Sequence, residues 1–99
     1  MSYKAIFSSS ALKEVKDSYN WYEQRSNGLG DRFFQYVNKS IALIIYHPEA
    51  FPIKKNKFRE TPIDKFPYLI IYEMRKKNSI AYILHVFHTK RNPNLKYIK

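Results

Sequence analysis

The segment YLIIYEM at residues 68–74, followed after RKKN at 75–78 by IAYILHVF at 80–87, decides the fold. Both runs are short, rich in Ile and Tyr, and apolar at successive positions, as a strand buried on both faces requires. The polar residues between them favour a tight turn. We therefore predict that the two runs form a central antiparallel hairpin.

Upstream of this hairpin the apolar spacing becomes helical, and it predicts two antiparallel helices. The first begins near Ala11 and ends near Gly28, which can adopt the left-handed backbone that closes a helix. Asp31 is placed to cap the second, which runs to His47-Pro48. Tyr3–Phe7 is predicted to be a short strand before the first helix. The recurring apolar positions are Leu12, Val15, Tyr19 and Tyr22, then Phe33, Phe34, Val37, Ile41, Ile44 and Ile45.

The segment between the second helix and the hairpin, residues 51–58, is basic and interrupted by Pro52. It suits a sheet-edge strand or a loop that enters one. A basic tail, Thr89–Lys99, follows the hairpin, and Asn92-Pro93 ends the last strand. The predicted order is β-α-α-β-β-β, an α+β fold in which a helical hairpin packs on one face of a small antiparallel-rich sheet. Residues 1–99 are predicted to form a single domain.

The positive charge lies almost entirely in the second half of the chain. The formal net charge is +10, with six Lys/Arg against five Asp/Glu in residues 1–50 and twelve against three in residues 51–99. Such a charge attracts RNA, DNA, the ribosome or an acidic protein segment, and it also serves solubility alone.

Several classes of protein are excluded by what the sequence does not contain. The absence of cysteine excludes disulfides and thiolate metal sites. We see no signal-peptide core, no apolar run long enough to span a membrane, and no glycine-rich phosphate loop. We therefore expect a cytoplasmic protein without cofactor or metal.

A first candidate site is the basic group Lys54, Lys55, Lys57 and Arg59. In a continuous strand, Lys55, Lys57 and Arg59 would point to one side and could hold phosphates, with Arg59 clamping a scissile phosphate. The structural alternative is an edge strand whose lysines prevent aggregation.

A second candidate follows the last strand and comprises His88, Lys90 and Arg91. His88 could act as a general acid or base at the sheet rim. Alternatively, His88 bonds a loop carbonyl and Arg91 pairs with a carboxylate such as Glu73 or Asp64, and we favour this structural interpretation. His85, inside a strand, is expected to be a hydrogen-bonded core residue.

Two aromatic features complete the candidates. Trp21-Tyr22 with Tyr19 could form a stacking platform, but aromatic residues at helical spacing are usually core residues. Tyr97 in the basic tail could stack on a base or exchange a proton, although tails are commonly disordered.

The order of these features resembles the ParE-like branch of the RelE/ParE toxins. The resemblance rests on motifs spread from Ala11 to Pro93, and no single one is diagnostic. They are Trp21-Tyr22-Glu23, Gly28-Leu29-Gly30, Arg32-Phe33, Pro48, Phe58-Arg59, Phe66-Pro67-Tyr68 with Ile70 and Tyr72, and His88-x-x-Arg91-x-Pro93.

The resemblance implies the toxin of a type II toxin–antitoxin, or plasmid-stabilisation, module, neutralised by an antitoxin whose C-terminal segment wraps it and through which it forms oligomers. RelE-like toxins cut mRNA on the ribosome, whereas ParE-like toxins poison DNA gyrase. In the first case Arg59 and Arg91 would clamp a phosphate while His88 or Tyr97 moves protons, and Lys54, Lys55, Lys57 and Lys90 would bind the target. The pattern after the last strand favours gyrase, with a non-toxic nucleic-acid-binding module as a third possibility.

Overall fold

The computed structural model describes residues 3–98. The elements run β1 (Lys4–Phe7), α1 (Ser9–Arg25), α2 (Leu29–Tyr46), β2 (Ile53–Lys55), β3 (Phe58–Pro62), β4 (Tyr68–Arg75) and β5 (Ile80–His88). Two short 3-10 turns, Lys76–Asn78 and Pro93–Leu95, follow β4 and β5. The α+β class and the helical hairpin are as predicted. Lys99, at the end of the expected tail, lies outside the described residues.

The sheet has five strands in the order β1-β5-β4-β3-β2. The predicted central hairpin is β4 and β5, paired antiparallel from Tyr68 with His88 to Arg75 with Ile80. β1 lies parallel to the first half of β5, pairing Lys4 with Ile80. The sheet is therefore antiparallel except at this edge.

Residues 51–58 were expected to form a sheet-edge strand or a loop that enters one, and β2 is an edge strand within them, but the predicted order was one strand short. The chain instead forms two antiparallel strands, β2 and β3, that pair Ile53 with Arg59. The turn between them depends on Asn56, whose φ of 53° lies in the left-handed region that asparagine tolerates better than most residues. This turn also ends the strand alternation that would have aligned Lys55, Lys57 and Arg59.

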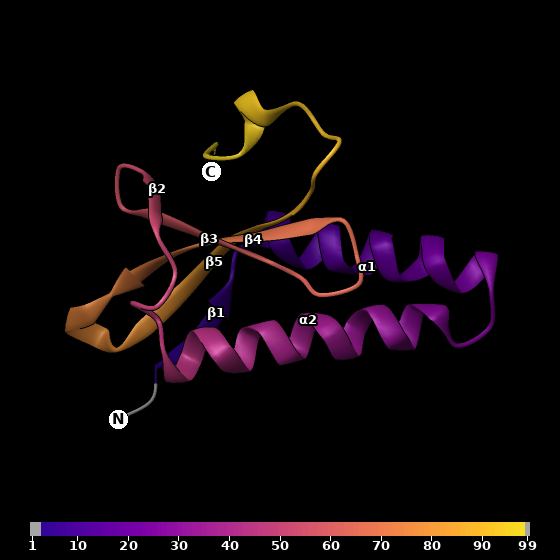
Figure 1. Cartoon of the computed structure of the whole chain (residues 1–99), viewed down its shortest axis with the longest axis horizontal. Helices are drawn as coiled ribbons and strands as arrows, with labels where there is room; N and C mark the ends of the chain where they lie inside the picture. The colour runs from indigo at the N-terminus through magenta and orange to yellow at the C-terminus, as the bar shows by residue number, and fades with distance from the viewer. Residues whose placement is uncertain (1–2, 99) are drawn as a thin grey trace.

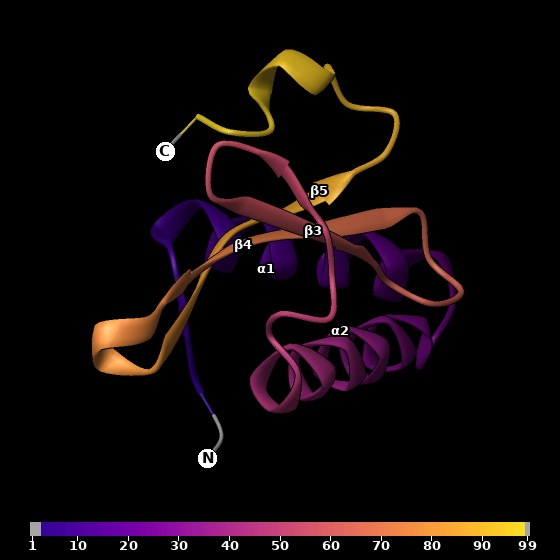
Figure 2. The same cartoon turned by 60° about the vertical axis from the view of Figure 1, so that its left-hand side comes forward.

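Three layers are visible in the molecule. Helices α1 and α2 cover one face of the sheet, and the C-terminal tail crosses the opposite face (Figures 1 and 2). The helix side holds the larger core, with Phe33, Ile44, Ile70, Tyr72 and Ile83 fully buried. The tail side holds a smaller cluster made of Phe58, Ile71, Leu84 and Phe87.

The turn between the helices is tight. Gly28 has a φ of 87° and is the N-cap of α2, which begins at Leu29. The prediction that Asp31 caps this helix was therefore wrong, and Asp31 accepts a hydrogen bond from the Tyr19 hydroxyl at 2.8 Å instead. The Glu23 carboxylate accepts the backbone N–H groups of Gly28 and Gly30 at 2.9 and 3.0 Å. Glu23 thus satisfies two amides that a helix N-terminus leaves without partners.

Candidate functional site

The C-terminal tail packs on the sheet through Tyr97 and Lys96. Tyr97 stacks on Phe58, with ring centroids 5.6 Å apart, and its hydroxyl donates a hydrogen bond to the buried carboxylate of Glu60. Lys96 also reaches Glu60, at 3.3 Å. Burial and the bond to Glu60 raise the pKa of Tyr97 to about 12. The phenol is therefore protonated at neutral pH and engaged within the fold.

The basic group lies beside this tail but does not form one row. The Lys55 ammonium lies 5.5 Å from the centre of the Tyr97 ring. Lys57 pairs at 3.0 Å with Glu73, a carboxylate with a 1% exposed side chain that Arg75 also contacts at 3.0 Å. Burial opposes ionisation of Glu73, but the two cations outweigh it and lower its pKa.

Arg59 points to the loop after α2. Its Nη1 donates to the carbonyl oxygen of Phe51 at 2.6 Å and to that of Glu49 at 3.4 Å. This contact joins the segment that follows α2 to β3, so the guanidinium has a structural role in the fold.

His88 at the end of β5 and Arg91 beyond it are also engaged, each with a different partner. The Nδ1 atom of His88 accepts the backbone N–H of Lys90 at 3.0 Å, and the His88 ring packs edge-on against Tyr68 at 4.9 Å. The expected carbonyl partner of His88 is therefore replaced by an amide. Arg91 pairs with Glu14 of α1 at 2.5 Å, where Glu73 or Asp64 had been the expected partner.

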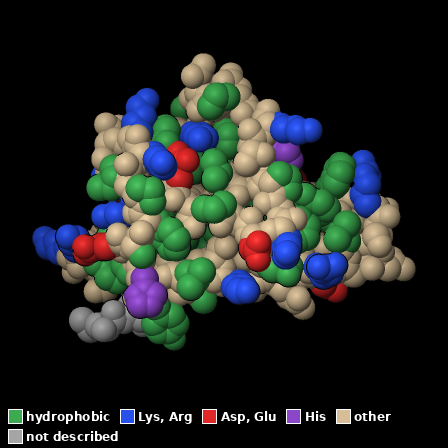
Figure 3. Space-filling model, in the orientation of Figure 1, with side chains coloured by type: hydrophobic (Ala, Val, Ile, Leu, Met, Phe, Trp, Pro, Cys, Tyr) green, Lys and Arg blue, Asp and Glu red, His purple; other side chains and the backbone are tan. Residues whose placement is uncertain are grey.

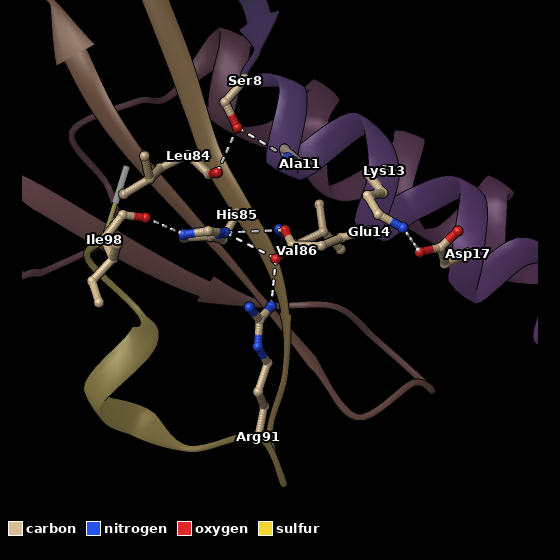
Figure 4. A network of polar contacts seen from close by, with 10 residues as sticks. All are labelled: Ser8, Ala11, Lys13, Glu14, Asp17, Leu84, His85, Val86, Arg91 and Ile98. Carbon is tan, nitrogen blue, oxygen red and sulfur yellow. Dashed lines mark hydrogen bonds and ion pairs between the residues drawn. The ribbon is translucent and has the colours of Figure 1, made fainter.

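Figure 4 shows that Glu14 belongs to a larger network between α1, β5 and the tail. His85, buried as predicted, places Nδ1 2.9 Å from Glu14 Oε2 and Nε2 2.6 Å from the carbonyl oxygen of Ile98. Glu14 also accepts the backbone N–H of Val86 at 2.9 Å. The Ser8 hydroxyl donates to the carbonyl oxygen of Leu84 at 2.7 Å. The Ser8 and Glu14 side chains thus hydrogen-bond backbone groups of β5 that lie beyond the end of β1 and have no partner strand on that side.

The four residues predicted to be catalytic therefore have four separate partners. Arg59 holds the loop after α2, His88 contacts Tyr68, Arg91 pairs with Glu14, and Tyr97 bonds Glu60. Within residues 3–98 no three or more His, Asp or Glu side chains are grouped to bind a metal. No described helix is long and apolar enough to cross a membrane.

A cleft beside the C-terminal half of α1 is the feature that the sequence analysis missed. It has a volume of about 590 Å³ and is lined by α1, the start of β4 and the end of β5. Trp21 was expected in the core, but it is 50% exposed at this cleft. Tyr22 does pack inward, against Phe33 and Phe66. The lining residues are Asp17, Ser18, Trp21, Tyr22, Pro67, Tyr68 and His88.

A second hollow, an apolar groove of about 400 Å³, lies on the other side of α1, between it and α2. Leu12 and Phe34, two of its lining residues, are 59% and 46% exposed. Phe7, Val15, Lys16, Tyr19, Val37 and Asn38 complete its lining. Hydrophobic side chains also gather between Lys and Arg on the face drawn in Figure 3, where acidic side chains are few.

Comparison with solved structures finds the same fold in two other proteins. The chain is similar to the isolated RelE toxin of E. coli, with a TM-score of 0.65 at 15% identity over 93% of this chain and 89% of that one. It is also similar to a chain of the chromosomal ParDE toxin–antitoxin system of P. aeruginosa, with a TM-score of 0.63 at 10% identity over 89% and 97% of the two chains. At these identities the likeness establishes the fold.

The family is established by sequence. No curated protein matches the chain significantly. The family model for the ParE toxin of the parDE type II toxin–antitoxin system, in contrast, matches residues 5–93, which extend from β1 to the turn after β5. The chain therefore belongs to the ParE toxin family and is the toxin of a type II toxin–antitoxin system.

Proposed function

We propose that this toxin arrests growth by binding DNA gyrase, without covalent chemistry of its own. The observation that carries this proposal is that each of the four candidate catalytic residues is held by a different partner within the fold. Cleavage of RNA by a 2′-hydroxyl needs a base, an acid and an anion clamp that converge on one phosphate. A gyrase poison needs only a binding surface.

The chemistry of the individual groups supports the same conclusion. The Tyr97 phenol, with a pKa of about 12, is a weak proton donor at neutral pH. The Arg59 guanidinium donates hydrogen bonds to two backbone carbonyls, which stabilise the fold.

An antitoxin is the other partner of a toxin of this kind, and we propose that it covers the groove between α1 and α2. The groove is almost wholly apolar, and its exposed Leu12 and Phe34 need a hydrophobic partner. An amphipathic helix presents side chains at the spacing that such a groove accepts. Complex formation with the antitoxin would then determine the oligomeric state.

Inducible expression without antitoxin tests the proposed target. Growth, a DNA-damage reporter and incorporation of labelled amino acids are followed from the moment of induction. Growth arrest with DNA damage, while translation continues at first, is expected. Early translation arrest with cleaved mRNA would establish the ribonuclease reaction instead, and normal growth would leave a binding module or an inactive relative.

A further inference from the structure

The cleft beside Trp21 has the composition of a protein-binding site. Its lining includes Tyr22, Tyr68 and Pro67 together with Trp21, which is half exposed. The Arg25 guanidinium lies over the Trp21 ring at 3.9 Å from its centre. Tryptophan, tyrosine and arginine around a well-formed hollow are the residues enriched at the centres of protein interfaces.

Hydrogen-bonding groups at the mouth of the cleft are fixed by local contacts. Because His88 Nδ1 accepts the Lys90 amide, the proton of a neutral imidazole is carried by Nε2, which can donate to a ligand. Asp17 is held by Lys13 at 2.8 Å. A peptide segment that enters the cleft thus meets both a potential donor and an acceptor.

The charges around the cleft indicate the sign of its partner. Among residues 3–98, Arg25 and Lys90 pair with no carboxylate, while Arg91 is already neutralised by Glu14. Arg25 lies next to Trp21, and Lys90 follows the cleft residue His88. The carboxylate of the lining, Asp17, is paired with Lys13. The Arg25 guanidinium over Trp21, with Lys90 two residues after His88, therefore favours a large apolar side chain flanked by carboxylates.

A nucleobase fits these features less well. One face of the Trp21 ring carries Arg25, and the ring also packs at 88° to Tyr22, at 5.1 Å between centroids. Stacking of a base requires an open aromatic face.

We infer that the cleft lined by Trp21, Tyr22, Tyr68 and His88 binds an acidic segment of the target protein, which inserts one large apolar side chain between α1 and the ends of β4 and β5. This inference rests on the proposed function, because it takes that target to be gyrase. It assigns the apolar groove and this cleft, on opposite sides of α1, to two different partners.

Inhibition of purified gyrase by the purified full-length chain tests the inference. Trp21→Ala should raise the toxin concentration for half-inhibition of supercoiling about 10-fold or more, as expected for an interface residue of this type. Arg25→Glu should weaken inhibition in the same direction. Matched controls are Tyr46→Ala, an exposed aromatic residue on α2 (68% exposed), and Lys39→Glu, an exposed charge reversal on α2, and neither should change inhibition.

Parallel measurements separate the possible failures. Circular dichroism and urea unfolding verify that each variant is folded, which is expected because Trp21 is half exposed. If the unaltered chain does not inhibit gyrase, the proposed function fails, and this inference fails with it. If the unaltered chain inhibits gyrase and Trp21→Ala inhibits it equally, this inference alone is wrong. It is also overturned if Trp21→Ala weakens binding to gyrase-free DNA by the same factor, or if it abolishes antitoxin binding alone.

Discussion

His85 on β5 and Glu14 on α1 face each other with 2.9 Å between Nδ1 and Oε2, although 71 positions separate them in the chain. The Glu14 carboxylate also pairs with Arg91 and accepts the backbone N–H of Val86. The other ring nitrogen of His85, Nε2, contacts the carbonyl oxygen of Ile98 in the tail. One carboxylate thus joins the first helix, the open edge of the last strand and the tail.

Loss of this carboxylate is expected to destabilise the protein. Glu14→Ala leaves the buried His85 nitrogen and the Val86 amide without an acceptor, at a cost of about 2–4 kcal/mol in the free energy of unfolding. Urea unfolding measures the change. Asp17→Ala, which breaks a solvent-exposed ion pair on the same helix, is the control and should leave the free energy of unfolding nearly unchanged. Equal effects of the two substitutions would contradict the role given to Glu14.

Gly30 is expected to be the less replaceable of the two glycines in the sequence. A Cβ atom at Gly30 would lie 2.7 Å from the carbonyl oxygen of Tyr19 and 3.0 Å from Glu23 Oε1, so the two helices would have to separate. Gly30→Ala should cost about 2–3 kcal/mol.

Gly28→Ala is the comparison, since a Cβ there has open space and only the positive φ of 87° opposes it. Its expected cost is about 1–2 kcal/mol, and Gly28→Asn should cost less. Thermal unfolding of the three variants ranks them. A Gly30→Ala protein more stable than Gly28→Ala would show that the helices are not packed at this distance.

The central hairpin and both helices follow from sequence because local signals determine them. Residues 68–75 and 80–88 are apolar at nearly every position, and the helices have a regular apolar spacing up to Pro48. The β2–β3 turn has no glycine or proline at its tip, and depends on Asn56 accepting a left-handed conformation. Sequence spacing alone therefore could not distinguish this turn from a continuous strand.

The partners of the candidate residues could not be predicted because they are distant in the chain. Arg91 was expected to pair with Glu73 or Asp64, but its partner Glu14 is 77 positions away. Trp21 was expected in the core because its neighbour Tyr22 has helical spacing with Tyr19. Helical spacing gives the buried stripe only approximately, and residues at its margin, such as Trp21, are left half exposed.

Alkaline pH is expected to unfold the protein through its buried tyrosines. Burial raises the pKa of Tyr22, Tyr72 and Tyr97 to about 12, from 10.0 for a free phenol, with hydrogen bonds adding to the effect in Tyr22 and Tyr97. Because the folded pKa lies above the unfolded one, the stabilisation is complete below pH 10 and is lost as the pH rises through about 12.

Ultraviolet absorbance of tyrosinate and far-ultraviolet circular dichroism, recorded together during a pH titration, check this prediction. These three phenols should ionise at the pH at which the helices unfold. Tyr97→Phe removes one of these ionisations. The stability of this variant should therefore fall less, between neutral pH and the alkaline transition, than the stability of the unaltered chain. Complete ionisation of all nine tyrosines before any loss of structure would contradict it.

The Arg59→Ala variant distinguishes a structural role of Arg59 from a catalytic one. The guanidinium bonds of Arg59 to the carbonyl oxygens of Phe51 and Glu49 hold the loop after α2, so their loss should lower the free energy of unfolding by about 1–3 kcal/mol. Gyrase inhibition by the folded variant should stay within about 2-fold of the unaltered chain, because a binding surface at α1 does not use this side chain. Lys54→Ala, an exposed residue on the neighbouring strand β2, is the control for removal of a positive charge. A folded Arg59→Ala protein that has lost growth inhibition, while Lys54→Ala retains it, would restore Arg59 as a phosphate-binding residue and favour cleavage of RNA over binding to gyrase.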